Sequence, residues 1–193
     1  MVDSSSITYV LHYSQEPPEC HPSRARSLHL INGLQDIQSY QRLYREIGGE
    51  WGWGRQRDWQ AMQWAQHLSK PDIQGWIMNW AGQANGFFEL RRQLDESVEI
   101  YYFGVAKALQ GQGLGSVLLQ YAVTAAKAMT KKTIWLKTSS TDHPTALGLY
   151  LRGGFKVMRV VPKGAPSQEP ALAHTTFALE RNGHETVPIV PLD

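Results

Sequence analysis

The 193-residue chain is long enough for one hydrophobic core, and its 42% hydrophobic content is ordinary for a globular domain. A net charge of +2 with scattered basic residues gives no argument for a nucleic-acid partner, and no apolar run reaches the length of a membrane span. The one cysteine, Cys20, leaves no disulfide framework, and the seven histidines lack metal-ligand spacing, so no metal site is expected.

Hydrophobic periodicity and turn residues divide the chain into strands and helices. In the first half of the chain we predict a strand at 7–13, a long loop at 14–33, helices at 36–47 and 58–68, and a hairpin of strands 73–80 and 86–91 joined by residues 81–85. A strand at 98–105, a helix at 114–129 and a strand at 133–138 follow. The last predicted elements are a helix capped by Asp142 and ended by Gly153 and Gly154, and strands at 157–161 and 173–179. We expect residues 1–180 to form one domain and residues 181–193 a C-terminal tail. The N-terminus lacks the features of a signal peptide, which favours a cytoplasmic protein.

A glycine-rich segment, Gln-Gly-Gln-Gly-Leu-Gly at 110–115, joins the strand at 98–105 to the amphipathic helix at 114–129. Such a loop at a helix N-terminus forms an anion site, because free N–H groups and the positive end of the helix dipole face the ligand. A P-loop is excluded because Ser116 follows Gly115 and no lysine is near. A Rossmann fingerprint lacks the acidic residue expected about twenty residues later, where Lys131 and Lys132 stand.

A second motif follows the strand at 133–138. The segment 142–155 reads Asp-His-Pro-Thr-Ala-Leu-Gly-Leu-Tyr-Leu-Arg-Gly-Gly-Phe, in which Pro144 suits a first helical turn. Its alanine, tyrosine and Gly-Phe pair stand at Ala146, Tyr150, Gly154 and Phe155.

Together these two motifs resemble the GNAT superfamily of N-acetyltransferases. Gln110, Gly113 and Gly115 fit the acyl-CoA pyrophosphate loop, Gln-x-x-Gly-x-Gly, and the second motif matches the superfamily pattern except that His143 replaces the usual asparagine. The resemblance covers residues 73–180, and the segments at 86–90, 102–105 and 142–144 look like a group of uncharacterised bacterial members.

The resemblance implies an α/β (α+β) GNAT fold, with a mixed central sheet flanked by helices. A right-handed crossover through the 114–129 helix makes the strands at 97–105 and 133–139 parallel neighbours, and we expect them to splay into a slot for the pantetheine arm, with Gly104 allowing a bend. Acetyl-CoA is the implied acyl donor. The residues expected to bind it are Phe103, Gly104, Val105, Gln110, Gly111, Gln112, Gly113, Leu114, Gly115, Ser116, His143, Ala146 and Tyr150.

Two residues are candidates for acid–base catalysis. An amine of pKa about 10.4 must lose a proton before it attacks the thioester, and Glu99 is the only carboxylate from Val98 to Ala106. Tyr150 stands where the superfamily commonly places the acid that protonates the departing thiolate. His143 could serve as a base, bind the cofactor or only cap a helix, and Glu99 could be a structural strand residue.

For the acceptor, the segment Glu-Trp-Gly-Trp-Gly at 50–54 offers two tryptophans and a nearby acid. Aromatic faces and a carboxylate suit a cationic amine, so Glu50, Trp51 and Trp53 are candidate acceptor residues, although the tryptophans could equally fill the core.

We therefore expect an acetyl-CoA-dependent N-acetyltransferase that acts on a primary amine of a small molecule by direct attack. A protein or peptide acetyltransferase and a non-catalytic acyl-CoA-binding module remain alternatives. The expected partners are acyl-CoA and an amine acceptor, without nucleic acid or membrane, and the sequence leaves a homodimer open.

Overall fold

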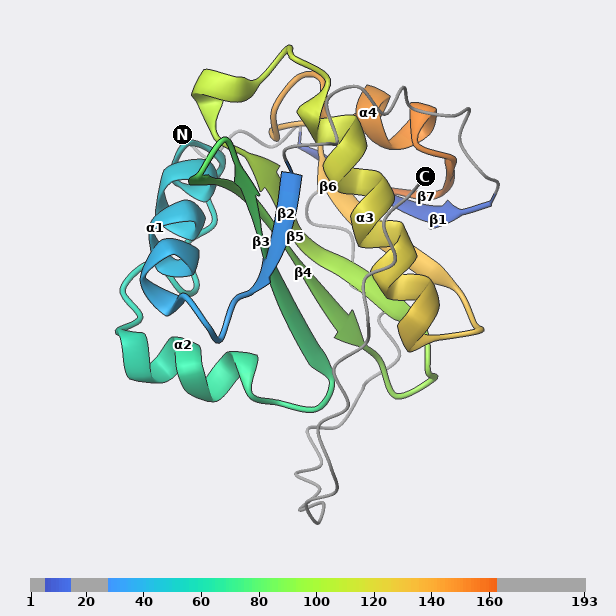
Figure 1. Ribbon diagram of the computed structural model, residues 1–193. Helices are drawn as coiled ribbons and strands as arrows, with labels where there is room; N and C mark the ends of the chain where they lie inside the picture. Colours follow the sequence, from blue (N-terminus) through green and yellow to red (C-terminus); the bar gives the residue numbers. More distant parts are fainter. Residues whose placement is uncertain (1–5, 15–27, 163–193) are drawn as a thin grey trace.

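The computed structural model describes residues 6–14 and 28–162, which form a seven-stranded mixed sheet with helices on both faces (Figure 1). The strands are β1 Ile7–Tyr13, β2 Leu28–Asn32, β3 Ile73–Trp80, β4 Gln83–Arg92, β5 Val98–Val105, β6 Ile134–Ser139 and β7 Phe155–Pro162. The α-helices are α1 Ile37–Gly48, α2 Ala61–Leu68, α3 Leu114–Met129 and α4 Ala146–Arg152, and the short 3-10 turns are η2 Gly49–Trp51 and η3 Lys107–Leu109. This is the mixed α+β architecture expected of a GNAT fold.

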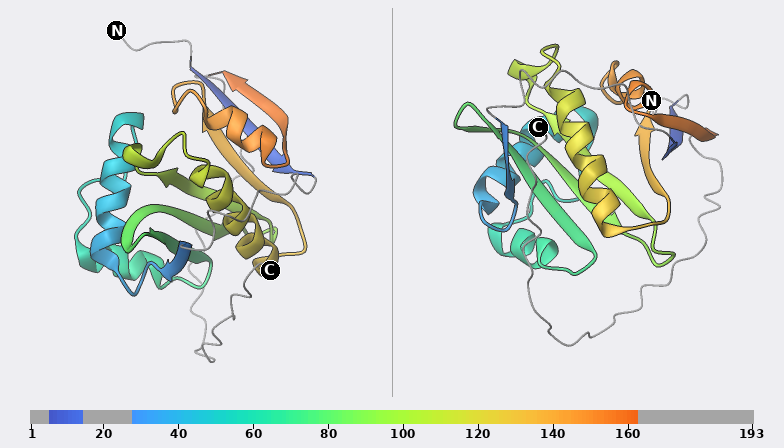
Figure 2. Two further views of the ribbon diagram at one scale, coloured as in Figure 1. Left: turned by 45° about the horizontal axis from the view of Figure 1, so that its top comes forward. Right: turned by 45° about the vertical axis from the view of Figure 1, so that its right-hand side comes forward.

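The strand order is β2-β3-β4-β5-β6-β1-β7, and every neighbouring pair is antiparallel except β5 and β6. The predicted parallel pair is confirmed, and its ladder covers only Val98–Ile100 against Ile134–Leu136. Beyond Ile100 the two strands no longer pair, and the two halves of the sheet lean apart toward the end where α3 begins (Figure 2).

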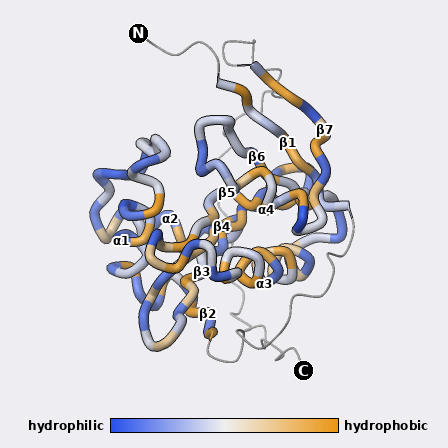
Figure 3. Tube along the Cα trace, turned by 90° about the horizontal axis from the view of Figure 1, so that it is seen from above, coloured by the Kyte–Doolittle hydropathy of each residue, from blue (hydrophilic) through white to orange (hydrophobic). Residues whose placement is uncertain are grey.

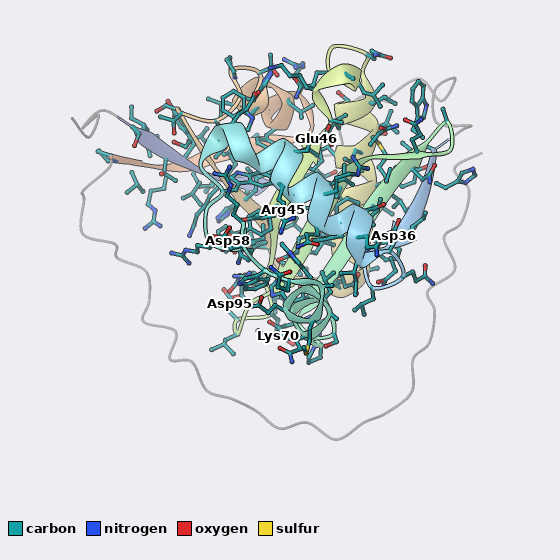
Figure 4. All side chains as sticks on the ribbon, turned by 90° about the vertical axis from the view of Figure 1, so that its left-hand side faces the viewer. Asp36, Arg45, Glu46, Asp58, Lys70 and Asp95 are labelled. Atoms are coloured by element: carbon teal, nitrogen blue, oxygen red, sulfur yellow. The ribbon has the colours of Figure 1, made fainter. Side chains whose placement is uncertain are left out.

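Two buried clusters hold the layers together. α3 packs on one face of the sheet through residues such as Leu114, Leu118 and Ala122, which are 0% exposed. On the other face, Tyr40 and Leu43 of α1 and Trp64 of α2 pack against β3–β5. Figure 3 shows the apolar segments meeting between the layers, and Figure 4 shows Arg45 and Glu46 on the outer side of α1. The apolar periodicity of each helix therefore fixes which side faces the sheet.

Several predicted boundaries were wrong. Part of the expected 14–33 loop is strand β2, which pairs with β3, while β1 crosses to lie between β6 and β7. The hairpin turn is two residues long, because Ala81 and Gly82 both adopt positive φ (52° and 79°) and Trp80 pairs with Gln83.

The helix predicted from residue 58 begins at Ala61, where Gln60 and Gln63 form a reciprocal capping box. In contrast, Asp36 caps α1 as its position suggests, accepting the Ser39 N–H at 3.0 Å. The predicted strand at 173–179 and the tail at 181–193 lie outside the described residues, so the single-domain assignment over 1–180 stays a prediction. No helix in the described part of the chain is both long and apolar enough to cross a membrane.

Candidate active site

A cavity of about 560 Å³ opens where β5 and β6 separate. Its walls come from the end of α1 and the segment after it, the end of β5, the glycine loop before α3, and the segment leading into α4. The lining residues are Ile47, Trp51, Trp53, Phe103, Gly104, Val105, Gln110, Gly111, Gly113, Gly115, Ser116, Asp142, His143, Thr145, Ala146, Leu149, Tyr150 and Arg152. The two motifs found in the sequence therefore meet in one cavity.

The glycine loop brings the N-terminus of α3 to this cavity. Gly111 and Gly113 have φ of 74° and 82°, a left-handed conformation that side chains with a Cβ rarely adopt. Gly113 caps α3, and its carbonyl accepts the N–H groups of Ser116 and Val117 at 3.1 and 3.4 Å. The Ser116 N–H is thus used within the helix, whereas the helix has no carbonyl partner for the backbone N–H groups that precede it. Those preceding N–H groups are the ones suited to binding an anion.

The glutamines of the loop have structural contacts. The side-chain amide of Gln110 donates to the Val105 carbonyl at 3.3 Å, which ties the loop to the end of β5. The side chain of Gln112 donates to the Ala108 carbonyl at 3.2 Å and does not line the cavity. The side chain of Leu114 is fully buried in the core, so only its backbone is available to a cofactor.

Gly104 allows α1 to approach β5 closely. A Cβ on Gly104 would lie 2.3 Å from Cγ2 of Ile47, which itself lines the cavity. The φ of Gly104 is not positive, so the predicted bend is not what requires glycine there. The required feature is space for Ile47.

Tyr150 lies on α4, buried between the rings of Phe103 and Phe155 at centroid distances of 5.9 and 6.3 Å. Burial raises the pKa of Tyr150, and the negative charge of Asp142 raises it further. The phenol therefore keeps its proton at neutral pH, as a general acid must.

Asp142 does not cap α4, because that helix begins at Ala146 with Thr145 as its N-cap. Instead its Oδ2 accepts the Ser139 N–H at 2.7 Å and the Thr138 hydroxyl at 2.8 Å, which holds the carboxylate at the end of β6. Asp142 is therefore a lining carboxylate that the sequence pattern attributed to a helix cap.

The Nδ1 atom of His143 accepts the Thr145 N–H at 3.2 Å. In a neutral imidazole the proton then sits on Nε2, which can donate a hydrogen bond. Its ring meets the Trp51 ring edge-on at 5.4 Å, so the segment after α1 touches the segment before α4.

Of the three candidate acceptor residues, Trp51 and Trp53 line the cavity and Glu50 does not. The carboxylate of Glu50 lies 3.1 Å from the Lys107 ammonium and is 58% exposed. Trp53 packs over Gly48 at the end of α1, where a Cβ would lie 2.4 Å from the indole ring.

The structure does not bring Glu99 to the cavity. Glu99 is buried, accepts the Gln93 side-chain amide at 2.9 Å, and lies where β5 and β6 still pair. Phe103 is the first residue of β5 that lines the cavity. Because a strand rises about 3.3 Å per residue, Glu99, four residues before Phe103, lies about 13 Å from it along the strand. The length of β5 between Glu99 and Phe103 separates this carboxylate from the site.

Sequence reasoning missed five of the lining residues, namely Ile47, Asp142, Thr145, Leu149 and Arg152. A signal was available for four of them, because Asp142, Thr145, Leu149 and Arg152 lie within the second motif. Ile47 reaches the site only through the packing of α1 on β5. Among the described residues, no group of three or more His, Cys, Asp or Glu side chains is placed to hold a metal ion.

Comparison with known proteins assigns the class. The model of the acetyltransferase (GNAT) family matches residues 37–155, more than half of the chain, so the protein belongs to the GNAT family of acetyltransferases. A search of curated proteins found no match.

Solved structures share the fold at low identity. A protein from Novosphingobium aromaticivorans assigned to the GNAT family is 16% identical with a TM-score of 0.58, and the alignment covers 83% of this chain and 63% of that protein. The aminoglycoside acetyltransferase meta-AAC0020, from an uncultured soil metagenomic sample and in complex with trehalose, is 14% identical with a TM-score of 0.57 and coverages of 83% and 100%. A Bacillus subtilis acetyltransferase in complex with CoA is 20% identical with a TM-score of 0.53 and coverages of 68% and 78%. The chain thus spans less than two thirds of the length of the Novosphingobium protein.

Proposed function

We propose that the protein transfers the acetyl group of acetyl-CoA to a primary amine of a small molecule. The glycine loop would hold the pyrophosphate on the N–H groups before Ser116, and the pantetheine arm would enter between the separated ends of β5 and β6. The thioester would then lie beside Tyr150, the buried phenol of this cavity.

In the reaction, the neutral amine attacks the thioester carbonyl, a C–N bond forms and the C–S bond breaks. Tyr150 gives its proton to the departing sulfur, which thereby becomes the thiol of CoA. The nitrogen releases a proton to solvent, and solvent returns a proton to Tyr150. His143 donates from Nε2 in its resting tautomer and contributes to binding.

The contact between Trp51 and His143 is the observation that favours a small acceptor. The two rings touch and both line the cavity, so side chains of two separate segments close this part of its wall. A lysine on the surface of a folded protein requires an open groove, whereas a small amine fits an enclosed site. The structural likeness to a small-molecule acetyltransferase agrees with this preference.

The test is release of CoA thiol from acetyl-CoA, measured across a panel of small amines with a peptide pool as one member. We expect amine-dependent thiol release, with the acetylated amine identified by mass spectrometry. Acetylation of the peptide pool alone would favour a peptide acetyltransferase. Binding of acetyl-CoA without turnover on any member would favour a non-catalytic acyl-CoA-binding module.

A further inference from the structure

We infer that the acceptor is a monoamine with a flat apolar body, of the arylalkylamine class. This inference rests on the proposed function and adds to it the chemistry of the acceptor. Three observations carry it: an aromatic wall, the pairing of the nearby acids, and the position of one carboxylate.

The aromatic wall consists of Trp51 and Trp53; the aliphatic Ile47 of α1 lines the cavity beside them. None of the three carries a charge. Stacking on flat aromatic surfaces favours a ligand with a planar apolar group of its own.

Trp53 is held rigidly. Its ring packs on Tyr102 and Tyr44 at centroid distances of 5.0 and 5.8 Å, and its carbonyl accepts the Tyr44 hydroxyl at 3.1 Å. The buried Gln56 adds to this support, because its Oε1 accepts the Tyr102 hydroxyl at 2.6 Å. The wall is therefore preformed, which limits the entropy lost when a flat ligand binds.

The acids of this segment are already paired outside the cavity. Glu46 forms an ion pair with Arg42 at 2.8 Å, and Glu50 forms one with Lys107 at 3.1 Å. The charged lining residues are Asp142 and Arg152, whose formal charges cancel. A polyamine or an aminoglycoside carries several ammonium groups and would need several carboxylates, so this lining disfavours a polycation.

Asp142 supplies one carboxylate, which attracts one amino group in its ammonium form; this nitrogen then releases a proton to solvent and attacks the thioester as the neutral amine. Its Oδ2 is engaged by Ser139 and Thr138, which fixes the orientation of the carboxylate in the lining. It lies close enough to Tyr150 to act on that phenol electrostatically. An amine held there is next to the group that would protonate the leaving thiolate, while its apolar body extends toward the tryptophans.

The experiment compares kcat/KM for 2-phenylethylamine and tryptamine, n-hexylamine, spermidine, an aminoglycoside and a peptide pool. We expect the two arylalkylamines to exceed spermidine and the aminoglycoside by about tenfold or more, the range that one pocket contact or unpaired charge supplies. A higher kcat/KM for spermidine or the aminoglycoside would overturn the acceptor class and leave the proposed function intact. Turnover of the peptide pool alone, or of nothing, would overturn the proposed function itself.

Two variants test the wall and the carboxylate with the full chain. Trp51→Leu should raise the KM for tryptamine about tenfold, whereas Trp80→Leu, a half-buried tryptophan of β3 that does not line the cavity, should leave it unchanged. Asp142→Asn should raise the KM for tryptamine while the KM for acetyl-CoA stays the same. An unchanged KM for tryptamine in both site variants would overturn the inference.

Discussion

At the scale of single residues, Tyr150 is the side chain on which the proposed chemistry depends. We predict that Tyr150→Phe lowers kcat about ten- to a thousand-fold, near the range for one acid–base group, while CoA affinity changes little. Only the phenolic proton is lost, and it matters when the thiolate departs, not when the cofactor binds. Steady-state kinetics and calorimetric titration with CoA measure the two quantities.

Tyr121→Phe is the matched control for this variant. Tyr121 is a half-buried tyrosine of α3 that packs on the core and does not line the cavity. Removing the hydroxyl of Tyr121 should therefore leave kcat unchanged. Normal turnover in Tyr150→Phe would mean that the thiolate leaves unprotonated or takes its proton from water.

Glu99 is expected to act structurally. Because the carboxylate lies at the paired end of β5 and bonds to Gln93, Glu99→Gln should leave the pH–rate profile in place. The dependence of kcat/KM on pH, measured for both proteins, checks this. A shift of the acidic limb in the variant would restore Glu99 as the group that prepares the amine.

At the scale of elements, a substitution in the glycine loop can lower stability through backbone strain and can also weaken ligand binding. Comparing Gly113 with a glycine of the same conformation outside the site, Gly82, separates the two effects. Gly113 and Gly82 have φ of 82° and 79°, and a Cβ at either position would meet no atom beyond its chain neighbours within 4 Å. Alanine at either position should therefore cost a similar amount of stability, about 1–2 kcal/mol. Gly113→Ala should in addition weaken CoA binding, because Gly113 lies in the anion site and Gly82 lies in the β3–β4 turn.

Thermal unfolding with and without CoA measures both effects. We expect the two variants to lose similar stability in the absence of CoA, and only Gly113→Ala to lose part of the stabilisation that CoA provides. Equal stabilisation of both variants by CoA would place the pyrophosphate elsewhere.

Elements with local signals were predicted well from the sequence. The strand at 98–105 and the helix at 114–129 match β5 and α3, because alternation and helical periodicity are local patterns and Gly113 marks the helix start. Strand β2 was missed because a five-residue edge strand with two polar positions has a weak pattern. The hairpin loop was predicted too long because Ala81 at positive φ is an unusual turn residue.

At the scale of the whole molecule, four buried tyrosines make the stability of the fold depend on alkaline pH. Burial raises the pKa of Tyr40, Tyr44, Tyr102 and Tyr150 above the ordinary value of about 10. Their contribution to stability is complete below that pH and is lost as pH rises through the higher pKa values of the folded state, because the unfolded chain releases these protons first. We expect the unfolding temperature to fall above about pH 10. Tyrosine absorbance should show part of the tyrosines titrating only on unfolding, and a constant unfolding temperature through this range would contradict the prediction.

The sequence predicted the lining residues from the glycine loop and the α4 motif better than those from α1. The glycine loop and the α4 motif are contiguous, so their residues could be placed by spacing. Contacts such as Ile47 against Gly104 and Trp51 against His143 join residues more than fifty positions apart and depend on how α1 packs on the sheet. Glu99 and Glu50 are not among the lining residues: Glu99 lies near the start of β5, and Glu50 forms an ion pair with Lys107.

A crystal structure of the protein with bound CoA tests the central claim most directly. The account predicts pyrophosphate oxygens on the backbone N–H groups before Ser116, the pantetheine arm between the separated ends of β5 and β6, and the thiol facing the Tyr150 hydroxyl. CoA bound away from the glycine loop, or a thiol directed away from Tyr150, would contradict it.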